Sequence, residues 1–521
     1  MTARMTRREA LLGGASAFAG LALSGCGGSV PPVARSGSTL ESTWGDPLGD
    51  GQLRVLAGEP FVVRDELGGR AGLGSELAVL AHLTDAHVLD ASSPARVPFL
   101  ARLGPPFQST FRPQEALTVQ VLAGAVRAVR ALRPSVVIQG GDLIDNDQSN
   151  ELGWALGVLG GGVVRPGSGR FGYYGVQSEF DPDPFYYRPA VDAPRHPGLL
   201  REAVRTLRLA GLGAASRWLP VLGDHDVLVA GEMVPDSLTA GLAVGDRALW
   251  DLPPGLSLPA GLRIQDTGSP DGPPVAGLVN GFLLRALAGP TVQVPADSRR
   301  RELQVGEVVA RLRSAAGGGV GSVDRLDYVV DVGPRVRLVV LDLASRVGGS
   351  GGVVVPGQAS FVADAVAGAG ERWVVLVSHQ PLDDSVGGSE VQAVLDSAPR
   401  VIATLAGHTH RNRVVPRATA AGGYWEIQTA SLVDYPQQSR ALRLLETRDG
   451  GVAIQMWMLD HVFPGRLGEI SRELSYLDAQ GGRPAGFAGG REDRNVVLYG
   501  AGGVSRTRRA RSRSASQKAP R

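Results

Sequence analysis

Short runs of apolar residues recur along the chain, and a polar cluster follows most of them. The runs are four to seven residues long and rich in Val, Leu and Ile, which is typical of buried strands; they span residues 77–83, 135–138, 218–222, 337–341, 373–377 and 401–405. Apolar residues at helical spacing lie between some of them, in 114–132, 199–210 and 357–369. Strands that alternate with helices predict an α/β fold with a largely buried sheet.

Two long segments interrupt this alternation. Residues 147–198 have no strong periodicity and hold four of the nine tyrosines, and residues 229–321 are rich in Gly and Pro. Loops of such length are unusual unless they form lids or small subdomains. We interpret both as insertions into one catalytic domain that spans residues 76–462. The clustered aromatic residues predict the small core of an inserted subdomain, and a lid whose rings stack on a substrate is the alternative.

The N-terminus has the form of an export signal. Three arginines, Arg4, Arg7 and Arg8, precede a run of small and apolar residues that is too short and glycine-rich to span a membrane comfortably. Part of residues 6–12 resembles the twin-arginine export motif. The chain's only cysteine, Cys26, ends a Leu-Ser-Gly-Cys sequence that resembles the bacterial lipobox, although a chance cysteine in an ordinary signal is the alternative.

These features predict an export signal over residues 1–25 and a flexible tether with an N-terminal extension over residues 26–75. We expect the twin-arginine translocase to export the chain. Lipidated Cys26 would then anchor it to the outer face of the cytoplasmic membrane, at the cell surface. A single cysteine also excludes an intramolecular disulfide bond.

The charge is unevenly distributed. The formal net charge is +2, but residues 505–521 hold seven positive charges and no acid, so the rest of the chain has a net charge of −5. We expect a C-terminal extension over residues 463–521 that ends in this basic, disordered tail. A solvated tail without a specific partner is the simpler interpretation of its charge. The acidic body argues against a nucleic-acid polymer as partner or substrate.

The polar clusters that follow the predicted strands share one chemistry. They hold five of the eight histidines, and they are Asp85–His87, Gly140–Asp142, Gly223–Asp226, Ser378–Pro381 and Gly407–His410. Carboxylate and imidazole groups suit divalent transition ions such as Zn, Mn and Fe. Sites in open α/β sheets form beyond the carboxyl ends of the strands, where these clusters fall. The sequence therefore predicts a metal site at that edge.

In order, the clusters resemble the signature of the calcineurin-like metallophosphoesterase superfamily: Asp-x-His, Gly-Asp, Gly-Asn-His-(Asp/Glu), His and Gly-His-x-His. The match runs from about residue 79 to residue 410. The insertions and the signal resemble, more narrowly, a small actinobacterial branch of that superfamily. The resemblance implies a two-sheet sandwich flanked by helices in αββα order. It also implies an enzyme that hydrolyses a phosphomonoester or phosphodiester with two divalent ions, Mn, Fe or Zn.

The resemblance also implies a role for each residue of the site. Seven residues would bind metal: Asp85, His87, Asp142, Asp224, His379, His408 and His410. Asp142 would bridge the two ions, Asp85, His87 and His410 would complete the first site, and the remaining three the second. His225 would protonate the leaving oxygen or stabilise charge on the phosphoryl group. Asp226 would orient His225 through a hydrogen bond.

Asp224 departs from the family pattern, which usually has asparagine at that position. A carboxylate there adds a negative charge, so we expect two metals but an altered metal preference or rate. Asp224 is also the one feature that favours the alternative function, a non-catalytic, metal-containing surface lipoprotein that binds a ligand. His225 favours the enzyme. Asp145 is a candidate for holding a metal-bound histidine, with a loop role equally open.

Overall fold

The computed structural model describes residues 37–104, 107–181, 183–213, 216–259, 276–480 and 485–500. The predicted export signal, Cys26 and the basic tail lie outside these residues. Within the described part of the chain, no helix has both the length and the apolar character needed to cross a membrane.

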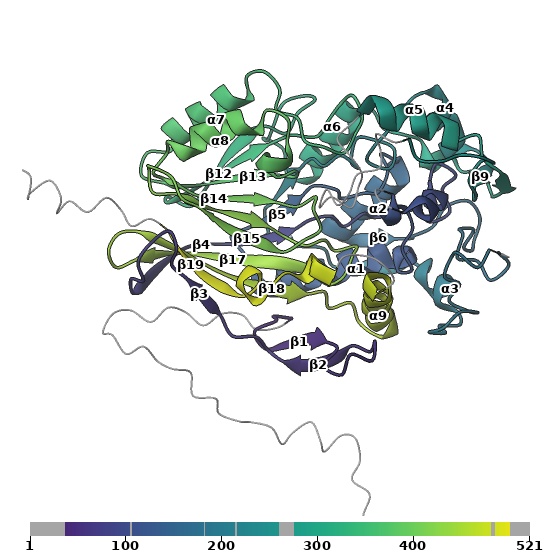
Figure 1. Cartoon of the computed structure of the whole chain (residues 1–521), viewed down its shortest axis with the longest axis horizontal. Helices are drawn as coiled ribbons and strands as arrows, with labels where there is room; N and C mark the ends of the chain where they lie inside the picture. Colours follow the sequence, from purple (N-terminus) through teal and green to yellow (C-terminus); the bar gives the residue numbers. More distant parts are fainter. Residues whose placement is uncertain are drawn as a thin grey trace, which may run out of the picture.

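Two sheets form the body of the protein (Figure 1). The larger sheet has seven strands, in the order β3 (Val62–Arg64), β19 (Val496–Tyr499), β18 (Val452–Asp460), β17 (Gln438–Thr447), β4 (Leu73–Leu83), β5 (Val136–Gly140) and β8 (Trp218–Val221). The other has six, in the order β11 (Tyr328–Val332), β12 (Val336–Leu341), β13 (Trp373–Ser378), β14 (Val401–Ala406), β16 (Tyr424–Gln428) and β15 (Arg413–Arg417). All six predicted strands are present in these sheets.

Helices cover the outer faces of both sheets. Helices α7 (Gln358–Ala367) and α8 (Gly388–Asp396) lie over the six-stranded sheet, while α1 (Thr118–Leu132), α2 (Ser149–Gly160) and α9 (Arg466–Gln480) accompany the seven-stranded one (Figure 1). Strand β12 shows why both of its faces are apolar: Val336, Leu338 and Val340 join the core between the sheets, whereas Val339 and Leu341 pack under α7 and α8. The fold is therefore the expected two-sheet sandwich flanked by helices.

Helix α2 lies inside the first predicted insertion, a segment without strong periodicity in the sequence. Its residues Leu152, Trp154 and Val158 join the main core, so the helix belongs to the body of the domain. The helix is apolar around most of its circumference and contains three glycines, which hides its amphipathic pattern. The predicted helix over 199–210 is wrong in its second half. Helix α3 (Leu199–Ala203) is followed by strand β7 (Leu207–Leu209), which pairs with β6 (Gly162–Val164).

The second insertion has structure of its own. Its elements are α4 (Ser237–Val244), β9 (Arg247–Leu249), α5 (Ala276–Ala286), β10 (Thr291–Gln293) and α6 (Val305–Ala315). Phe282 and Leu249 pack with Phe99 and Phe107 in a separate small core. The tyrosine-rich segment also contributes to a small core, because Tyr186 is fully buried and packs against Phe111. Tyr186 and Tyr187 belong to a small core that also includes Ile470 and Leu474 of α9, whereas Phe171 and Phe180 are exposed. The predicted subdomain core therefore holds for part of the aromatic cluster.

The terminal segments are parts of the main sheet. Strand β19 pairs with β18, and β3 pairs with β19 at the sheet edge. Sheet pairing therefore extends past both ends of the catalytic domain predicted over residues 76–462. The predicted N-terminal extension also contains a hairpin, β1 (Ser42–Gly45) and β2 (Arg54–Ala57).

Candidate metal centre

The seven predicted metal ligands converge at one edge of the two sheets. Each follows the carboxyl end of β4, β5, β8, β13 or β14, and the parallel pairing of these strands within each sheet brings their ends together. All seven side chains are buried. They form two groups of close ligand atoms, one of Asp85, His87 and His410 and one of Asp142, Asp224, His379 and His408, and a third group of His87, Asp142 and His225 overlaps both. The family resemblance implied the same two sets, with Asp142 as a bridge between them.

Asp142 lies between the two groups. Its Oδ2 atom is 3.0 Å from Nε2 of His379 in one group and 3.7 Å from Nε2 of His87 in the other. In the first group, Nε2 of His410 is 3.2 Å from Nε2 of His87 and 3.3 Å from Oδ1 of Asp85. Such a carboxylate is placed to bridge two ions.

The polar atoms that face this space fit cations. Among the described residues, Asp142 Oδ2, Asp224 Oδ2 and His379 Nε2 are buried without a hydrogen-bond partner. Buried polar atoms are rarely left in this state unless an ion or water satisfies them. A donor set of imidazole nitrogens and carboxylate oxygens suits divalent transition ions, so the residues present fit the expected metals.

The backbone is strained where the ligands lie. Eight described non-glycine residues have a positive φ, and five of them are predicted ligands: Asp85, His87, Asp142, His408 and His410. Such conformations cost free energy and cluster at functional sites. Gly223 shows how tightly the loops pack, because a Cβ atom there would lie 2.1 Å from Oδ1 of Asp142. The loops that hold the ligands therefore adopt unfavourable backbone conformations to place these side chains.

Neighbouring groups fix the ring orientation of three ligand histidines. Nδ1 of His379 is 2.8 Å from the backbone oxygen of Gly140, and Nδ1 of His87 is 3.2 Å from Oδ1 of Asp145. Nδ1 of His410 is 2.6 Å from Oδ2 of Asp434. Each contact leaves Nε2 directed at the metal space, which is the usual arrangement for metal-bound histidines.

Asp434 is a site residue that the sequence interpretation did not assign. It follows β16, which runs parallel to β14 and ends at the same edge of the sheet, so the strand-end pattern contained the signal. Arg112 was also missed. Its Nε atom donates a hydrogen bond of 2.8 Å to Oδ1 of Asp434, and both side chains are buried. Arg112 has no local motif, and only the tertiary fold reveals its place.

His225 and Asp226 do not contact each other in the predicted way. Nδ1 of His225 is 2.7 Å from the backbone oxygen of Asp145, which leaves Nε2 as the nitrogen that gains and loses a proton. Asp226 instead accepts hydrogen bonds of 2.9 Å from the backbone amides of Leu143 and Gly223. The prediction that Asp226 orients His225 is therefore corrected: Asp226 ties the two ligand loops together.

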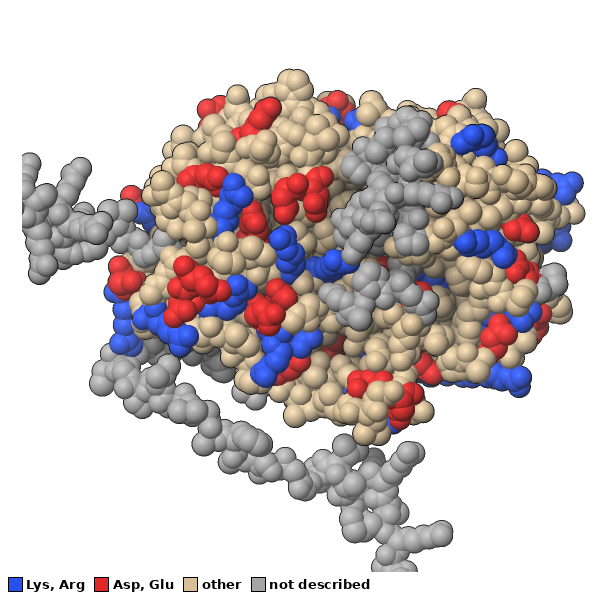
Figure 2. Space-filling view, viewed as in Figure 1, with Lys and Arg blue, Asp and Glu red and all other residues tan. Residues whose placement is uncertain are grey.

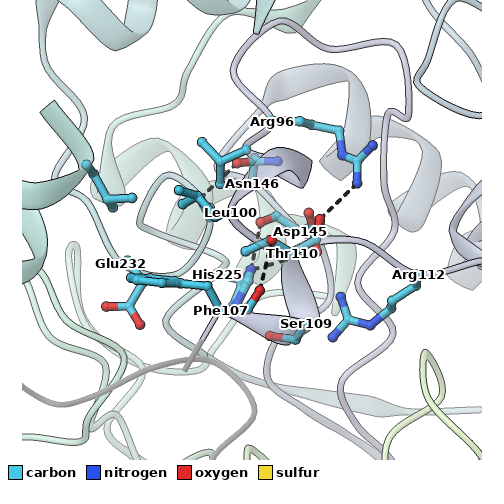
Figure 3. Close-up of a pocket in the computed structure, with 13 residues that line it drawn as sticks. Arg96, Leu100, Phe107, Ser109, Thr110, Arg112, Asp145, Asn146, His225 and Glu232 are labelled. Atoms are coloured by element: carbon cyan, nitrogen blue, oxygen red, sulfur yellow. Dashed lines mark hydrogen bonds and ion pairs between the residues drawn. The ribbon is translucent and has the colours of Figure 1, made fainter. Parts of the chain in front are cut away.

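A small pocket of about 30 Å³ opens beside His225. Figure 3 shows Asp145, His225 and Arg112 around the same hollow, with Arg96 nearby. Arg96 is paired with Glu115 at 2.7 Å, and both side chains are buried. Apolar side chains of η1 (Pro98–Leu103) and α5, among them Leu100 and Leu283, line the other wall. A ligand bound between the metal-ligand groups would therefore lie next to His225 and to a pocket that is partly apolar.

The electrostatics of the cluster favour bound cations. Burial opposes protonation of His379, but the carboxylates of Asp142 and Asp85 outweigh it and raise the pKa of His379 well above its usual value. Burial opposes ionisation of Asp85, yet His410 and His379 lower its pKa to about 2. Burial and the Asp142 carboxylate raise the pKa of Asp226 to about 7. The cluster therefore holds positive charge strongly.

Comparisons with known proteins add a likeness of fold. No protein-family model matches the chain, and no curated protein matches it either. Among solved structures, a dimetal phosphatase from Danio rerio is similar with a TM-score of 0.40 and 13% identity, over 74% of this chain and 98% of that chain.

Two further solved structures are similar. The sulfate thiohydrolase SoxB of Thermus thermophilus, in complex with glycerol, has a TM-score of 0.28 and 13% identity, over 77% of this chain and 60% of that chain. PhoD has a TM-score of 0.31 and 10% identity, over 82% of this chain and 80% of that chain. At these scores the likenesses carry no information on the activity of this chain.

Proposed function

We propose that this chain is a metal-dependent phosphoesterase that hydrolyses a phosphomonoester or phosphodiester. The observation that carries the proposal is the pair of buried ligand groups that share Asp142, with His225 beside them. The order of the motifs along the chain agrees with this function. Two divalent ions in these groups would polarise the phosphoryl oxygens and activate a water molecule for attack.

The residues of the chain have separate tasks in this proposal. Asp85, His87 and His410 would hold one ion, and Asp224, His379 and His408 would hold the other. Asp142, which lies close to both groups, would contribute to both sites. Asp145 uses its carboxylate to fix His87 and its backbone oxygen to fix His225. A single residue therefore sets the distance between the first metal group and the proton donor.

His225 is the proposed proton donor to the leaving oxygen. Its Nε2 atom is 3.9 Å from Oδ2 of Asp224, so the ring stands at the rim of the second group. The pocket that His225 lines gives the leaving group a place next to this nitrogen. General acids positioned in this way contribute about 10²–10⁴-fold to the rate.

We also propose that the enzyme acts at the cell surface. Support comes from the sequence alone, from the signal-like residues 1–25 and the lipobox-like sequence that ends at Cys26. Export through the twin-arginine translocase and lipidation of Cys26 would place the enzyme on the outer face of the cytoplasmic membrane. Its substrate would then be a phosphate ester that reaches that compartment.

Turnover of paired model esters tests the proposed chemistry. The manganese-loaded chain is assayed with nitrophenyl phosphate and bis(nitrophenyl) phosphate, before and after removal of metal. His196→Ala serves as a matched control for His225→Ala, because His196 pairs with Glu473 away from the site. Metal-dependent turnover of either ester that the control retains and His225→Ala loses supports the proposal. Turnover that does not depend on metal rules it out.

A further inference from the structure

A groove of about 420 Å³ lies away from the metal centre, between α1, the end of α2, β7 and the segment after β18. Apolar side chains line its floor: Val126, Val158, Leu207, Leu209 and Phe463. The groove includes no residue of the candidate metal centre. A ligand held there would leave the metal centre accessible.

Arginines surround this apolar floor. Arg127, Arg130 and Arg208 line the groove, and Arg133 lines an adjoining hollow together with Arg127 and Arg130. All four are exposed. Within the described part of the chain, no carboxylate forms an ion pair with any of their side chains. Helix α1 itself contains no acidic residue.

Figure 2 shows the charged side chains on one face of the molecule. There, acidic and basic side chains lie next to one another, so that their charges largely offset. Around the groove, four positive charges remain without such compensation, next to open apolar surface. A region of this kind attracts an anionic surface that also offers apolar groups.

The place where the described chain begins adds an independent observation. The backbone oxygen of Gly37 accepts a hydrogen bond of 2.8 Å from the amide of Asp460. A Cβ atom at Gly37 would lie 3.2 Å from Val462 and 3.6 Å from Ala128, which are the sequence neighbours of Phe463 and Arg127 in the groove. Cys26 precedes Gly37 by 11 residues. Such a stretch can span at most about 40 Å when fully extended. A lipid on Cys26 would therefore keep the membrane within reach of the groove.

We propose that this groove, formed by α1 and β7, docks on an anionic lipid bilayer surface. The arginines bind the phosphates of the headgroups, and the apolar floor receives the adjoining glycerol and upper acyl region. A basic patch beside a lipid anchor adds electrostatic attraction to anionic lipids. The inference rests on the proposed location of the protein and is independent of the proposed chemistry.

The lining favours lipid over nucleic acid. Proteins that bind single strands present several aromatic rings on which bases stack, and Phe463 is the one aromatic residue in the lining of the groove. Aliphatic side chains of Val126, Leu207 and Leu209 make up most of the floor instead. These groups suit a lipid interface, where apolar contact accompanies electrostatic attraction.

Vesicle binding tests the proposal. Every arm uses the full chain with Cys26→Ser, so that no attached lipid contributes. Partition coefficients are measured on vesicles of phosphatidylglycerol with phosphatidylcholine and on vesicles of phosphatidylcholine alone. The groove variant is Arg127→Glu with Arg208→Glu. Arg247→Glu with Arg285→Glu is the matched control, because these two arginines are also exposed but lie on β9 and α5.

We expect binding to the anionic vesicles that is at least about 20-fold weaker for the groove variant and little changed for the control, because each basic residue near such a surface contributes roughly fivefold. The N- and C-terminal segments are the same in all variants, so their contribution to vesicle binding cancels when the partition coefficients of two variants are divided. Thermal unfolding verifies that both variants fold, and Arg127→Gln with Arg208→Gln replaces the groove variant if it does not.

Binding of the same preparations to a single-stranded oligonucleotide is measured alongside. Three results would overturn the proposal: no preference for anionic vesicles, equal losses of vesicle binding in the groove variant and the control, or a groove variant that loses oligonucleotide binding but keeps vesicle binding. Turnover of nitrophenyl esters by the same preparations separates a failure of docking from a failure of the proposed enzymatic function.

Discussion

Asp434 binds His410 across the site, with Oδ2 of the carboxylate 2.6 Å from Nδ1 of the imidazole ring. Arg112 binds the other carboxylate oxygen, so a buried chain of charges runs from the pocket to the metal space. The contact fixes which nitrogen of His410 faces the metal. Residues that support ligands in this way are nearly as important to a metal site as the ligands themselves.

Replacing Asp434 should therefore weaken metal binding while the protein stays folded. We expect Asp434→Asn to lower the affinity of the first metal group by about 10–100-fold, because His410 loses its anionic partner. Competition with a chelator measures this affinity. Asp383→Asn is the control, since Asp383 is exposed and only loosely paired with Arg413. Equal affinities in Asp434→Asn and the control would contradict the role of Asp434.

The proton-donor role of His225 predicts a dependence on the leaving group. A phenolate leaving group needs a proton in the transition state more than a nitrophenolate does. We expect His225→Ala to lower kcat by about 10²–10⁴-fold for phenyl phosphate and by much less for nitrophenyl phosphate, with metal content unchanged. The ratio of kcat values for the two esters measures the effect. The same loss with both esters would mean that His225 stabilises charge without donating a proton.

Asp224 is positioned to change the second metal group. Oδ1 of Asp224 accepts a hydrogen bond of 2.9 Å from Gln380 and lies 3.3 Å from Nδ1 of His408, whereas Oδ2 has no hydrogen-bond partner among the described residues. Asp224→Asn removes one negative charge at nearly constant shape. We expect weaker binding of the second ion and faster turnover per occupied site, because the ion keeps more of its charge.

Calorimetric titration of metal and kcat at saturating metal test this prediction. Asp246→Asn, an exposed carboxylate on the surface, is the control. Metal affinity and kcat that are both unchanged in Asp224→Asn would show that the carboxylate acts as the usual asparagine does.

Glu302 predicts a pH dependence of stability. Burial raises its pKa from 4.5 to about 7, and Asp236 adds to the shift. The folded chain therefore holds this proton more tightly than the unfolded chain. The resulting stabilisation is complete below about pH 4.5 and is lost as the pH rises through 7. We expect Glu302→Gln to reduce the fall in melting temperature between pH 5 and pH 8.

Glu390→Gln is the control for this measurement, because Glu390 is exposed on α8. Asp147 is buried beside Glu302 and its pKa is also raised, by burial first and then by Glu302, so part of the pH dependence should remain. An unchanged pH dependence in Glu302→Gln would show that its carboxyl group has the same pKa in the folded and unfolded chains.

The sequence predicted the strands and the ligands for a common physical reason. A strand buried on both faces needs an unbroken apolar run, and a ligand loop needs polar residues and glycine, so the boundary between them is visible in the chain. The residue pairs that support the ligands could not be predicted in this way. Arg112 and Asp434 are 322 positions apart, and neither lies in a local pattern that names the other.

The errors in the predicted elements have related causes. Helix α2 is buried on several sides, so its apolar residues do not mark a single stripe. Residues 199–210 match a helical pattern, but pairing of β7 with β6 overrides the local preference after Ala203. The family resemblance assigned Asp226 to orient His225, whereas the carboxylate of Asp226 accepts hydrogen bonds from the amides of Leu143 and Gly223. Tertiary contacts decide each of these cases.

We propose that one buried site of this chain holds two divalent ions. The number of ions per chain, measured by elemental analysis after reloading with manganese and removal of free metal, tests it most directly. We predict two ions in the wild-type chain, and one ion each in His87→Ala and His408→Ala, because these histidines belong to different ligand groups. A wild-type chain that retains one ion or none under saturating conditions would contradict the account.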